Sequence, residues 1–451
     1  MIKVLDTRTD AREAIRKAAR RPAPEEMEVA PRVLERTKEI FQESLTPQEA
    51  VARIIADVRE RGNAAVLEYA RRIDGANLQE STMWVSQEEL VQAKEKVSDE
   101  FLDALVLATE QIRSYHRKQL PNSWWETDKD GLLLGQKYTP VRSVGAYVPG
   151  GSAPLVSSLL MSCIPAQVAG VEEIIVATPV SGQGQVNPHI LAAADHLGLD
   201  RILKIGGAQA IAALAFGTET VPQVDKIVGP GNIFVTLAKK QVFGHVGIDM
   251  LAGPSEILII ADETANPAWV AADLLSQAEH DPDAAAVLVT PSRSLGVLVQ
   301  EELARQVEQL DRKEWALESL KRYGMIVYTR DLQEATEIAN LFAPEHLELC
   351  VADPFGLLSQ IHNAGAIFLG HHTCESLGDY VAGPNHILPT NGSARFSSCL
   401  DVHTFLKRSS VIYYTPARLQ EHGPKAAQLA DVEGLQAHGE AVRIRLRGGG
   451  A

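Results

Sequence analysis

The run Ala343-Pro344-Glu345-His346-Leu347-Glu348 sets a carboxylate beside an imidazole directly after a proline. An imidazole titrates between about pH 5 and 8 and can move protons, while a neighbouring carboxylate can activate water. Glu345 and His346 would therefore suit acid–base chemistry. The same run would also suit a helix C-terminus with incidental polar residues, because the helix dipole favours histidine there.

A second set of side chains has the donor atoms of a metal site. Gln277 and His280 are three residues apart on a helix that begins at Asn266-Pro267, so they share one face and can offer two ligands. The competing interpretation is a surface helix end that happens to carry a histidine. Asp379, a hard oxygen ligand, follows on a glycine-rich loop, and His386 lies seven residues later.

Other reactive side chains are expected to be bystanders. His371 and His372 are adjacent, so on an extended chain they point to opposite faces and neither is expected to bind metal. The chain has four cysteines: Cys163, Cys350, Cys374 and Cys399. They form no CxxC motif, which indicates reduced thiols in the cytosol. A cysteine nucleophile would suit aldehyde oxidation. A packing role is favoured for Cys163 and Cys350. Cys374 is the one to test, although it too is expected to be a bystander.

The chain has no GxGxxG motif, the usual dinucleotide fingerprint, and three glycine turns take its place. They are Tyr147–Ser152, Gly206–Gln209 and Gly229–Asn232. A glycine turn that leads into a helix offers bare N–H groups to a phosphate. Each turn alone fits a tight connection without a ligand, but two in successive strand–helix units favour an anion site modestly.

The totals exclude some classes of protein. The chain has 451 residues, which favours more than one domain, and a formal net charge of -15, which disfavours nucleic acid as a partner. The N-terminus is polar and has no signal-peptide core. The uncharged stretch 143–171 contains three prolines, so we expect a buried loop and helix and not a membrane span. We expect a cytoplasmic protein.

Short β-branched runs alternate with helical runs from about residue 140, after some 120 residues of helical character. The expected strands are 173–178, 202–205, 226–228, 256–261, 285–290, 325–329 and 366–369. This alternation predicts mostly parallel sheets covered by helices. Ligands bind such sheets in the loops at the carboxyl ends of the strands.

The tail from about Asp401 is expected to be an appendage. It contains a short strand-like run, Ala441–Leu446, and ends in Gly-Gly-Gly-Ala. Glu433 and His438 lie in a polar stretch of the tail, and by themselves they indicate only a solvated patch.

In their order along the chain, these pieces resemble the histidinol dehydrogenases. The most specific stretches are YVPGGSAPLVSSLLMSCIPAQVAGV, ALAFGTETVPQVDKIVGPGNIFV, IDMLAGPSEILIIADETANP, DLLSQAEHD, FAPEHLEL, GDYVAGPNHILPT and EGLQAH. The resemblance covers nearly the whole chain and is strongest from Gly145 to Ser410. We expect an α/β protein with two incomplete Rossmann-like domains of mostly parallel sheets, and small N- and C-terminal appendages that mediate dimerisation.

The expected domains follow from the same resemblance. An N-terminal helical arm takes residues 1–29. The main α/β domain, with the catalytic and metal residues, takes 30–146 and 255–400. A second Rossmann-like domain with the NAD contacts takes 147–254, and a C-terminal dimerisation tail takes 401–451.

The resemblance also implies a role for individual residues. One zinc ion per subunit would be bound by Gln277, His280 and Asp379. A tail histidine, His438, from the partner in an obligate homodimer would be the fourth ligand. Neither nucleic acid nor a membrane is expected as a partner. The implied substrate contacts are Ser255, Gln277, His280, His346, Asp379, His386, Glu433 and His438. The implied NAD contacts are Tyr147, Gln209 and Asn232.

The implied reaction is the four-electron oxidation of L-histidinol to L-histidine with two NAD, the last step of histidine biosynthesis. His346 would take the hydroxyl proton, and Glu345 would activate water to hydrate the bound aldehyde. Three alternatives stay open: a paralogous zinc- and NAD-dependent dehydrogenase for another small polar alcohol, a zinc hydrolase, and a non-catalytic metal-binding scaffold.

Overall fold

A computed structural model of the chain describes residues 2–9, 31–150, 154–180 and 184–448. The chain divides into two compact units. The first unit comprises Met1–Gln119 and Arg142–Thr404, and the second comprises Leu120–Val141 and Phe405–Ala451. Each unit is described separately below.

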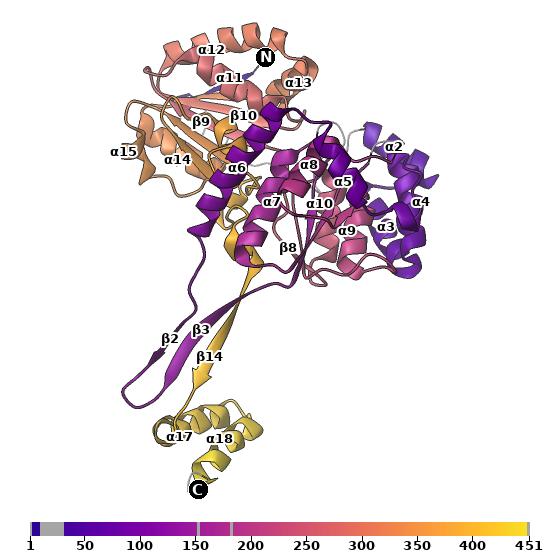
Figure 1. The fold of residues 1–451 in the computed structure, drawn as a ribbon. Helices are drawn as coiled ribbons and strands as arrows, with labels where there is room; N and C mark the ends of the chain where they lie inside the picture. The colour runs from indigo at the N-terminus through magenta and orange to yellow at the C-terminus, as the bar shows by residue number, and fades with distance from the viewer. Residues whose placement is uncertain (1, 10–30, 151–153, 181–183, 449–451) are drawn as a thin grey trace. The chain divides into compact units, whose positions relative to one another are not determined.

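The larger sheet of the first unit has six strands in the order β1-β11-β10-β9-β12-β13, and every pairing is parallel (Figure 1). Its strands are β1 (Lys3–Asp6), β9 (Glu256–Ala261), β10 (Ala285–Thr290), β11 (Met325–Tyr328), β12 (His346–Cys350) and β13 (Ala366–Leu369). Its helices are α11 (Pro267–Ala278), α12 (Arg293–Gln306), α13 (Lys313–Arg322), α14 (Leu332–Phe342), α15 (Pro354–Leu358) and α16 (Glu375–Tyr380).

Both faces of this sheet are buried, which explains the continuous apolar runs of its central strands. Alternate residues of β9 enter two hydrophobic clusters: Ile257 and Ile259 pack with residues of α11, α12 and α13, while Leu258 and Ile260 pack with α14. Figure 1 shows α11 to α13 grouped together and α14 apart from them. The period of two along the strand thus divides the core between the faces.

The smaller sheet has five parallel strands in the order β6-β5-β4-β7-β8. Its strands are β4 (Ser143–Tyr147), β5 (Glu173–Ala177), β6 (Ile202–Leu203), β7 (Lys226–Val228) and β8 (Gly247–Ile248). The helices that follow them are α7 (Val156–Ala169), α8 (Pro188–His196), α9 (Gly207–Phe216) and α10 (Ile233–Val242). The prediction of mostly parallel sheets covered by helices is confirmed.

The N-terminal helices pack with the smaller sheet. They are α2 (Pro31–Phe41), α3 (Pro47–Arg61), α4 (Asn63–Asp74), α5 (Gln87–Lys94) and α6 (Asp99–Arg117). Apolar side chains of α3 and α4, including Ile54 and Tyr69, share one hydrophobic cluster with α9 and α10. We expected residues 30–146 to belong with the larger sheet, and for α3 and α4 the packing differs from that expectation.

The first described residues form a strand and not a helix. Residues Lys3–Asp6 form β1, which pairs with β11 at one edge of the larger sheet, so the expected helical arm is wrong for these residues. The expected arm otherwise falls largely on residues 10–30, which lie outside the described residues. The division into two Rossmann-like domains stays a prediction.

The second unit is a three-stranded antiparallel sheet followed by two helices. The strands, in the order β14-β3-β2, are β2 (Trp124–Thr127), β3 (Leu133–Pro140) and β14 (Leu406–Tyr413), and the helices are α17 (Pro416–Val432) and α18 (Gln436–Gly448). The strand expected at Ala441–Leu446 is wrong, because this segment lies within α18. Val442 and Leu446 are four residues apart, and both face Gly423 of α17.

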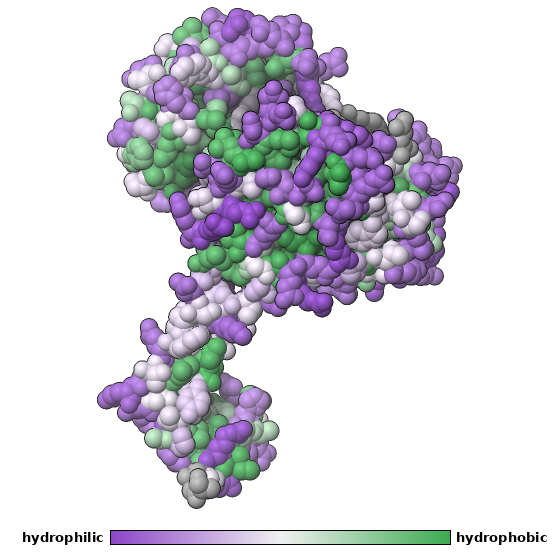
Figure 2. Space-filling model, in the orientation of Figure 1, coloured by the Kyte–Doolittle hydropathy of each residue, from purple (hydrophilic) through white to green (hydrophobic). Residues whose placement is uncertain are grey.

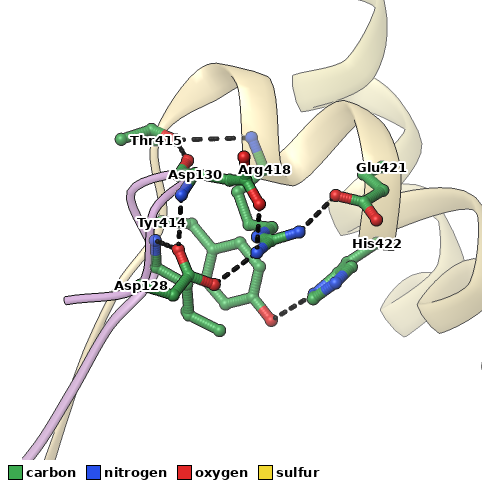
Figure 3. Close-up of polar contacts among 8 residues, drawn as sticks. Asp128, Asp130, Tyr414, Thr415, Arg418, Glu421 and His422 are labelled. Atoms are coloured by element: carbon green, nitrogen blue, oxygen red, sulfur yellow. Dashed lines mark hydrogen bonds and ion pairs between the residues drawn. The ribbon is translucent and has the colours of Figure 1, made fainter. Parts of the chain in front are cut away.

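Arg418 ties α17 to the turn between β2 and β3 (Figure 3). Its guanidinium forms ion pairs with Asp128, with Asp130 at 2.8 Å, and with Glu421. Thr415 caps α17 and also donates to the carbonyl oxygen of Asp130 at 3.0 Å. These contacts fix the start of the tail helices on the hairpin.

The described residues of the uncharged stretch 143–171 include β4 and α7. Helix α7 has 14 residues, and a helix of about 20 apolar residues is needed to cross a bilayer. Among the described residues, no helix combines the length and apolar character that a membrane span requires.

Candidate active site

Glu345 and His346 lie at the amino end of β12, beside the amino end of the neighbouring parallel strand β9. Helix α14 ends at Phe342, and Ala343 takes a left-handed conformation with φ of 49°. His346 then begins β12 and is opposite Ile257, the second residue of β9. The helix-end interpretation of the pair is therefore wrong. We also expected ligand sites at the carboxyl ends of the strands, but this pair lies at an amino end.

The backbone of Glu256 holds both members of the pair. Its N–H donates to Glu345 Oε2 at 2.8 Å, and its carbonyl oxygen lies 3.0 Å from His346 Nδ1. A carbonyl oxygen can only accept, so Nδ1 carries a hydrogen and Nε2 is the nitrogen with a lone pair in the neutral ring. Both side chains are buried.

Two further carboxylates face His346 Nε2. Asp379 Oδ1 is 3.7 Å away and Glu375 Oε1 is 3.9 Å away, and both residues lie on α16. These two carboxylates and the imidazole can together offer three ligand atoms within 4.8 Å of one another. Glu375 is also fixed by Ser276, whose hydroxyl donates to Glu375 Oε2 at 2.9 Å.

The charges in this cluster shift the pKa of each group. Burial raises the pKa of Glu345 to about 8, although His346 opposes this shift. Burial alone would lower the pKa of His346, but the carboxylates of Glu345, Asp379 and Glu375 outweigh it and raise the pKa to about 10. Burial would raise the pKa of Asp379, but His346 and His386 lower it below its usual value. The site thus favours a negative Asp379 beside a readily protonated imidazole.

Several buried polar atoms around this cluster lack a hydrogen-bond partner among the described residues. They are Gln277 Oε1, His346 Nε2, Asp379 Oδ1 and His386 Nε2. An unpaired buried polar atom is costly, so atoms of this kind mark the place of a ligand. An amide oxygen, a carboxylate and imidazole nitrogens are donors that suit zinc. The residues present therefore fit a catalytic metal.

His280 belongs to the same electrostatic environment. It follows the last turn of α11, and burial of its ring lowers the pKa of His280 while Asp379 opposes the shift. A lowered pKa keeps the imidazole neutral, which is the form that binds metal. The pKa of His386 is likewise lowered by burial, and Asp379, His346 and His280 all act on it.

The three glycine turns follow the strands β4, β6 and β7 of the smaller sheet at its carboxyl edge; β4 and β7 are neighbours, and β5 lies between β4 and β6. Tyr147 ends β4, and its hydroxyl accepts a hydrogen bond from the Gly207 N–H at 3.1 Å. Gln209 is fully buried on α9, and its Nε2 donates to Asp74 at 3.2 Å. Asn232 caps α10, where its Oδ1 accepts from two backbone N–H groups. Residues 151–153 of the first turn lie outside the described residues.

Comparison with known proteins identifies the family. The family model described as histidinol dehydrogenase matches residues 37–446. The histidinol dehydrogenase of Geobacillus kaustophilus is 53% identical over 400 residues, which cover 89% of this chain and 94% of that protein. The chain belongs to the histidinol dehydrogenase family. The histidinol dehydrogenase of Thermosynechococcus vestitus is 52% identical over 89% of this chain and 93% of that protein.

The fold agrees with that of a solved member of the histidinol dehydrogenase family. The crystal structure of histidinol dehydrogenase from Elizabethkingia anophelis has a TM-score of 0.90 and is 36% identical, with 99% of this chain and 98% of that chain covered. Dehydrogenases are oxidoreductases, so the hydrolase and scaffold alternatives lose their support.

The sequence analysis did not assign Glu375, Glu348 or Asp273 to the site of this histidinol dehydrogenase family member. Glu348 is fully buried on β12, where its Oε1 accepts from the Glu375 N–H at 2.8 Å. Burial raises the pKa of Glu348 well above its usual value and that of Asp273 to about 6. The sequence does contain a sign of Glu348: it is a carboxylate in an otherwise apolar run, two residues after His346. In a strand, residues two apart have their side chains on the same face.

Two residues implied by the family resemblance lie in the second unit. Glu433 follows the last residue of α17 and His438 lies on α18, and both are exposed. Ser255 precedes β9 and is half-buried. Their roles stay predictions.

The cysteines differ in their surroundings. Burial raises the pKa of Cys163 to about 12, and it also raises that of Cys350. Such thiols are poor nucleophiles. Cys374 is half-buried at the start of α16, directly before Glu375.

Proposed function

We propose that this protein oxidises L-histidinol to L-histidine in two successive steps, with NAD as the electron acceptor and zinc in the site. The observation that carries the proposal is the arrangement at Glu256, whose backbone fixes Glu345 and leaves His346 Nε2 open toward Asp379 and Glu375. Membership of the histidinol dehydrogenase family supports the substrate and the redox chemistry.

His346 acts as the proton acceptor in both oxidations. Its Nε2 takes the hydroxyl proton of L-histidinol, and the nearby carboxylates of Asp379 and Glu375 stabilise the resulting imidazolium. Glu345 acts between the two steps. Because its Oε2 is occupied by the Glu256 N–H, Oε1 is the oxygen that takes a proton from the water that hydrates the aldehyde. Two NAD molecules, bound one after the other, would each accept one hydride.

Zinc would be held by Gln277, His280 and Asp379, with His438 of the partner subunit as the fourth ligand. The unpaired buried oxygens of Gln277 and Asp379 support the first and third of these roles. Zinc, when bound, holds and orients the amino alcohol. In this proposal His346 acts as the base through Nε2, the nitrogen that carries the lone pair of the neutral ring.

Substrate and NAD contacts complete the proposal. Ser255 and His386 would contact the substrate, and Glu433 would face its cationic end. NAD would lie along the carboxyl edge of the smaller sheet, at the turns that hold Tyr147, Gln209 and Asn232. The substrate would also touch the metal ligands and His346.

The second unit would join two subunits in a homodimer. Figure 2 shows hydrophobic side chains on the visible face of this unit. Its exposed large apolar residues include Trp124, Trp125, Leu134, Ile412, Leu429 and Val432. Exposed apolar surface of this extent is typical of a protein interface. We also infer a cytoplasmic enzyme.

Steady-state formation of NADH tests the function. Zinc-loaded protein should form two NADH for each L-histidinol consumed, and calorimetry should show NAD binding. If turnover occurs only with another small polar alcohol, the chain is a paralogous dehydrogenase. Absence of both turnover and NAD binding would overturn the proposal.

A further inference from the structure

A buried ion pair lies beneath the Gly229–Asn232 turn and takes no part in the proposed chemistry. Lys239 is on α10 and Asp249 directly follows β8, and their side chains are 3% and 1% exposed. Burying two charges removes them from water at a high cost, and apolar residues of similar volume often stabilise a protein equally well. Stability alone therefore does not explain why two charged residues are buried at this place.

Both partners of this pair bind the same residue of the turn. Lys239 Nζ donates to the carbonyl oxygen of Gly229 at 2.9 Å, and the Gly229 N–H donates to Asp249 Oδ2 at 2.8 Å. Gly229 has a φ of +111°, and a Cβ atom there would lie 2.2 Å from the backbone oxygen of Tyr147. The first residue of the turn is thus fixed between β4 and the ion pair.

Asp249 also begins the segment that leads to the acid–base pair. The Met250 N–H donates to Asp249 Oδ1 at 2.6 Å, and the Gly253 N–H donates to Thr390 Oγ1 at 2.6 Å. The segment reaches Glu256 seven residues after Asp249, and the backbone of Glu256 holds Glu345 and His346.

Helix α10 contacts this segment a second time. The Thr236 hydroxyl donates to the carbonyl oxygen of Ala252 at 3.2 Å, one turn of helix before Lys239. Asn232 caps the same helix. The turn, the helix and the segment therefore form one hydrogen-bonded frame, with the ion pair at its centre.

We propose that Lys239 and Asp249 are positioning residues that fix the Gly229–Asn232 turn relative to Glu256, and so set the distance between NAD and the acid–base pair. The inference rests on the proposed function, because the turn has this role only if the chain binds NAD. Reacting atoms must approach closely and in a fixed orientation, so a small displacement of the turn would slow hydride transfer.

The double variant Lys239→Met/Asp249→Leu tests the inference because it leaves no lone buried charge. We expect this variant to fold, to bind NAD at least about tenfold more weakly by calorimetry and to lose kcat, since the turn is no longer held. Its zinc content and its affinity for L-histidinol should stay within about twofold of the parent values, which a general loss of structure would not allow. Lys240→Met, an exposed change on the same helix, is the matched control and should bind NAD normally.

The outcomes separate the two proposals. Unchanged NAD affinity and unchanged kcat in the folded double variant would overturn the positioning role. Failure of the parent protein itself to bind NAD would overturn the proposed function instead. If the double variant does not fold, Asp249→Asn decides the question: it keeps an oxygen for the Gly229 N–H but loses the charge. We then expect weaker NAD binding with normal L-histidinol binding, and parent-like NAD binding would refute the inference.

Discussion

His346 Nδ1 lies 3.0 Å from the carbonyl oxygen of Glu256, and this contact decides which nitrogen of the ring can accept a proton. The N–H of the same residue, Glu256, holds Glu345 Oε2. One residue at the start of β9 therefore orients both groups of the proposed acid–base centre. Neither contact uses the side chain of Glu256, so the arrangement is determined by the pairing register of β9 and β12.

Separate substitution of the pair should separate the two half-reactions. His346→Asn removes the proton acceptor, so oxidation of L-histidinol should fall about 10²- to 10⁴-fold. Glu345→Gln should impair oxidation of supplied L-histidinal more than the alcohol step. NADH formation from each substrate measures both effects. Equal losses on both substrates in both variants would contradict this division of labour.

Glu375→Gln should change the pH profile of the enzyme. Glu375 Oε1 lies 3.9 Å from His346 Nε2, and its charge helps to raise the pKa of that imidazole. The base works when neutral, so loss of the carboxylate should move the rising limb of kcat/KM to lower pH. Glu318→Gln, an exposed change on α13, should leave the profile in place. An unshifted limb in Glu375→Gln would argue that this carboxylate does not act on His346.

Zinc content should depend on Gln277 and Asp379 but not on the paired histidines nearby. Gln277→Ala and Asp379→Ala each remove a proposed ligand, so metal affinity should fall by more than the 10- to 100-fold that loss of an outer-shell partner typically causes. His371→Ala and His372→Ala should retain one zinc per subunit. Elemental analysis after dialysis against a chelator measures this, and full zinc occupancy in Gln277→Ala would exclude that residue as a ligand.

Mixing two inactive variants tests whether the tail serves the partner subunit. His438→Ala damages the tail and Asp379→Asn damages the core, so a mixed dimer with a tail shared across subunits has one doubly damaged site and one intact site. After denaturation and refolding together, about a quarter of the parent activity should return. If each tail completed its own subunit's site, the mixture would stay inactive.

Asp74→Asn should stabilise the protein at neutral pH. Burial raises the pKa of Asp74 to about 6 from an ordinary value of 3.8, so its charged form is disfavoured in the folded state. The penalty is absent below about pH 4 and complete above pH 6, where it amounts to at most about 3 kcal/mol. The amide that replaces the carboxylate can still accept the hydrogen bond from Gln209 through its side-chain oxygen.

Urea unfolding from pH 8 down to 4.5 measures this effect. The advantage of the Asp74→Asn variant should shrink as the pH falls. Asp103→Asn, an exposed change on α6, should show no such trend. A constant difference between the Asp74→Asn variant and the parent at every pH would show that burial of the charge is not its cause.

The fold class could be predicted from the sequence because the strands of both parallel sheets are buried runs separated by helices, as in 256–261 and 285–290. The metal and acid–base candidates could be found from residue type and family resemblance. The Glu256 contacts could not, because they use backbone groups that carry no sequence signal. Glu375 was missed for a related reason: its place beside His346 depends on how α16 returns to the amino edge of the sheet.

The strand expected at Ala441–Leu446 shows a different limit of sequence reasoning. A short run that alternates between apolar residues and arginine fits a strand, but Val442 and Leu446 both pack against Gly423 at a helical spacing. Packing against α17 therefore decided the local structure. β1 was missed because a four-residue strand gains its stability from pairing with β11, which is more than 300 residues away in sequence.

The antiparallel pairing of β3 with β14 joins residues 133–140 to residues 406–413. During synthesis β3 leaves the ribosome long before its partner strand exists, and at about 5–20 residues per second the wait is roughly 15 to 50 seconds. The second unit is therefore the last part of the chain that can fold. A chain that stops before β14 would leave an open strand edge at β3 and would lack the tail helices. Such a chain could not form the proposed homodimer.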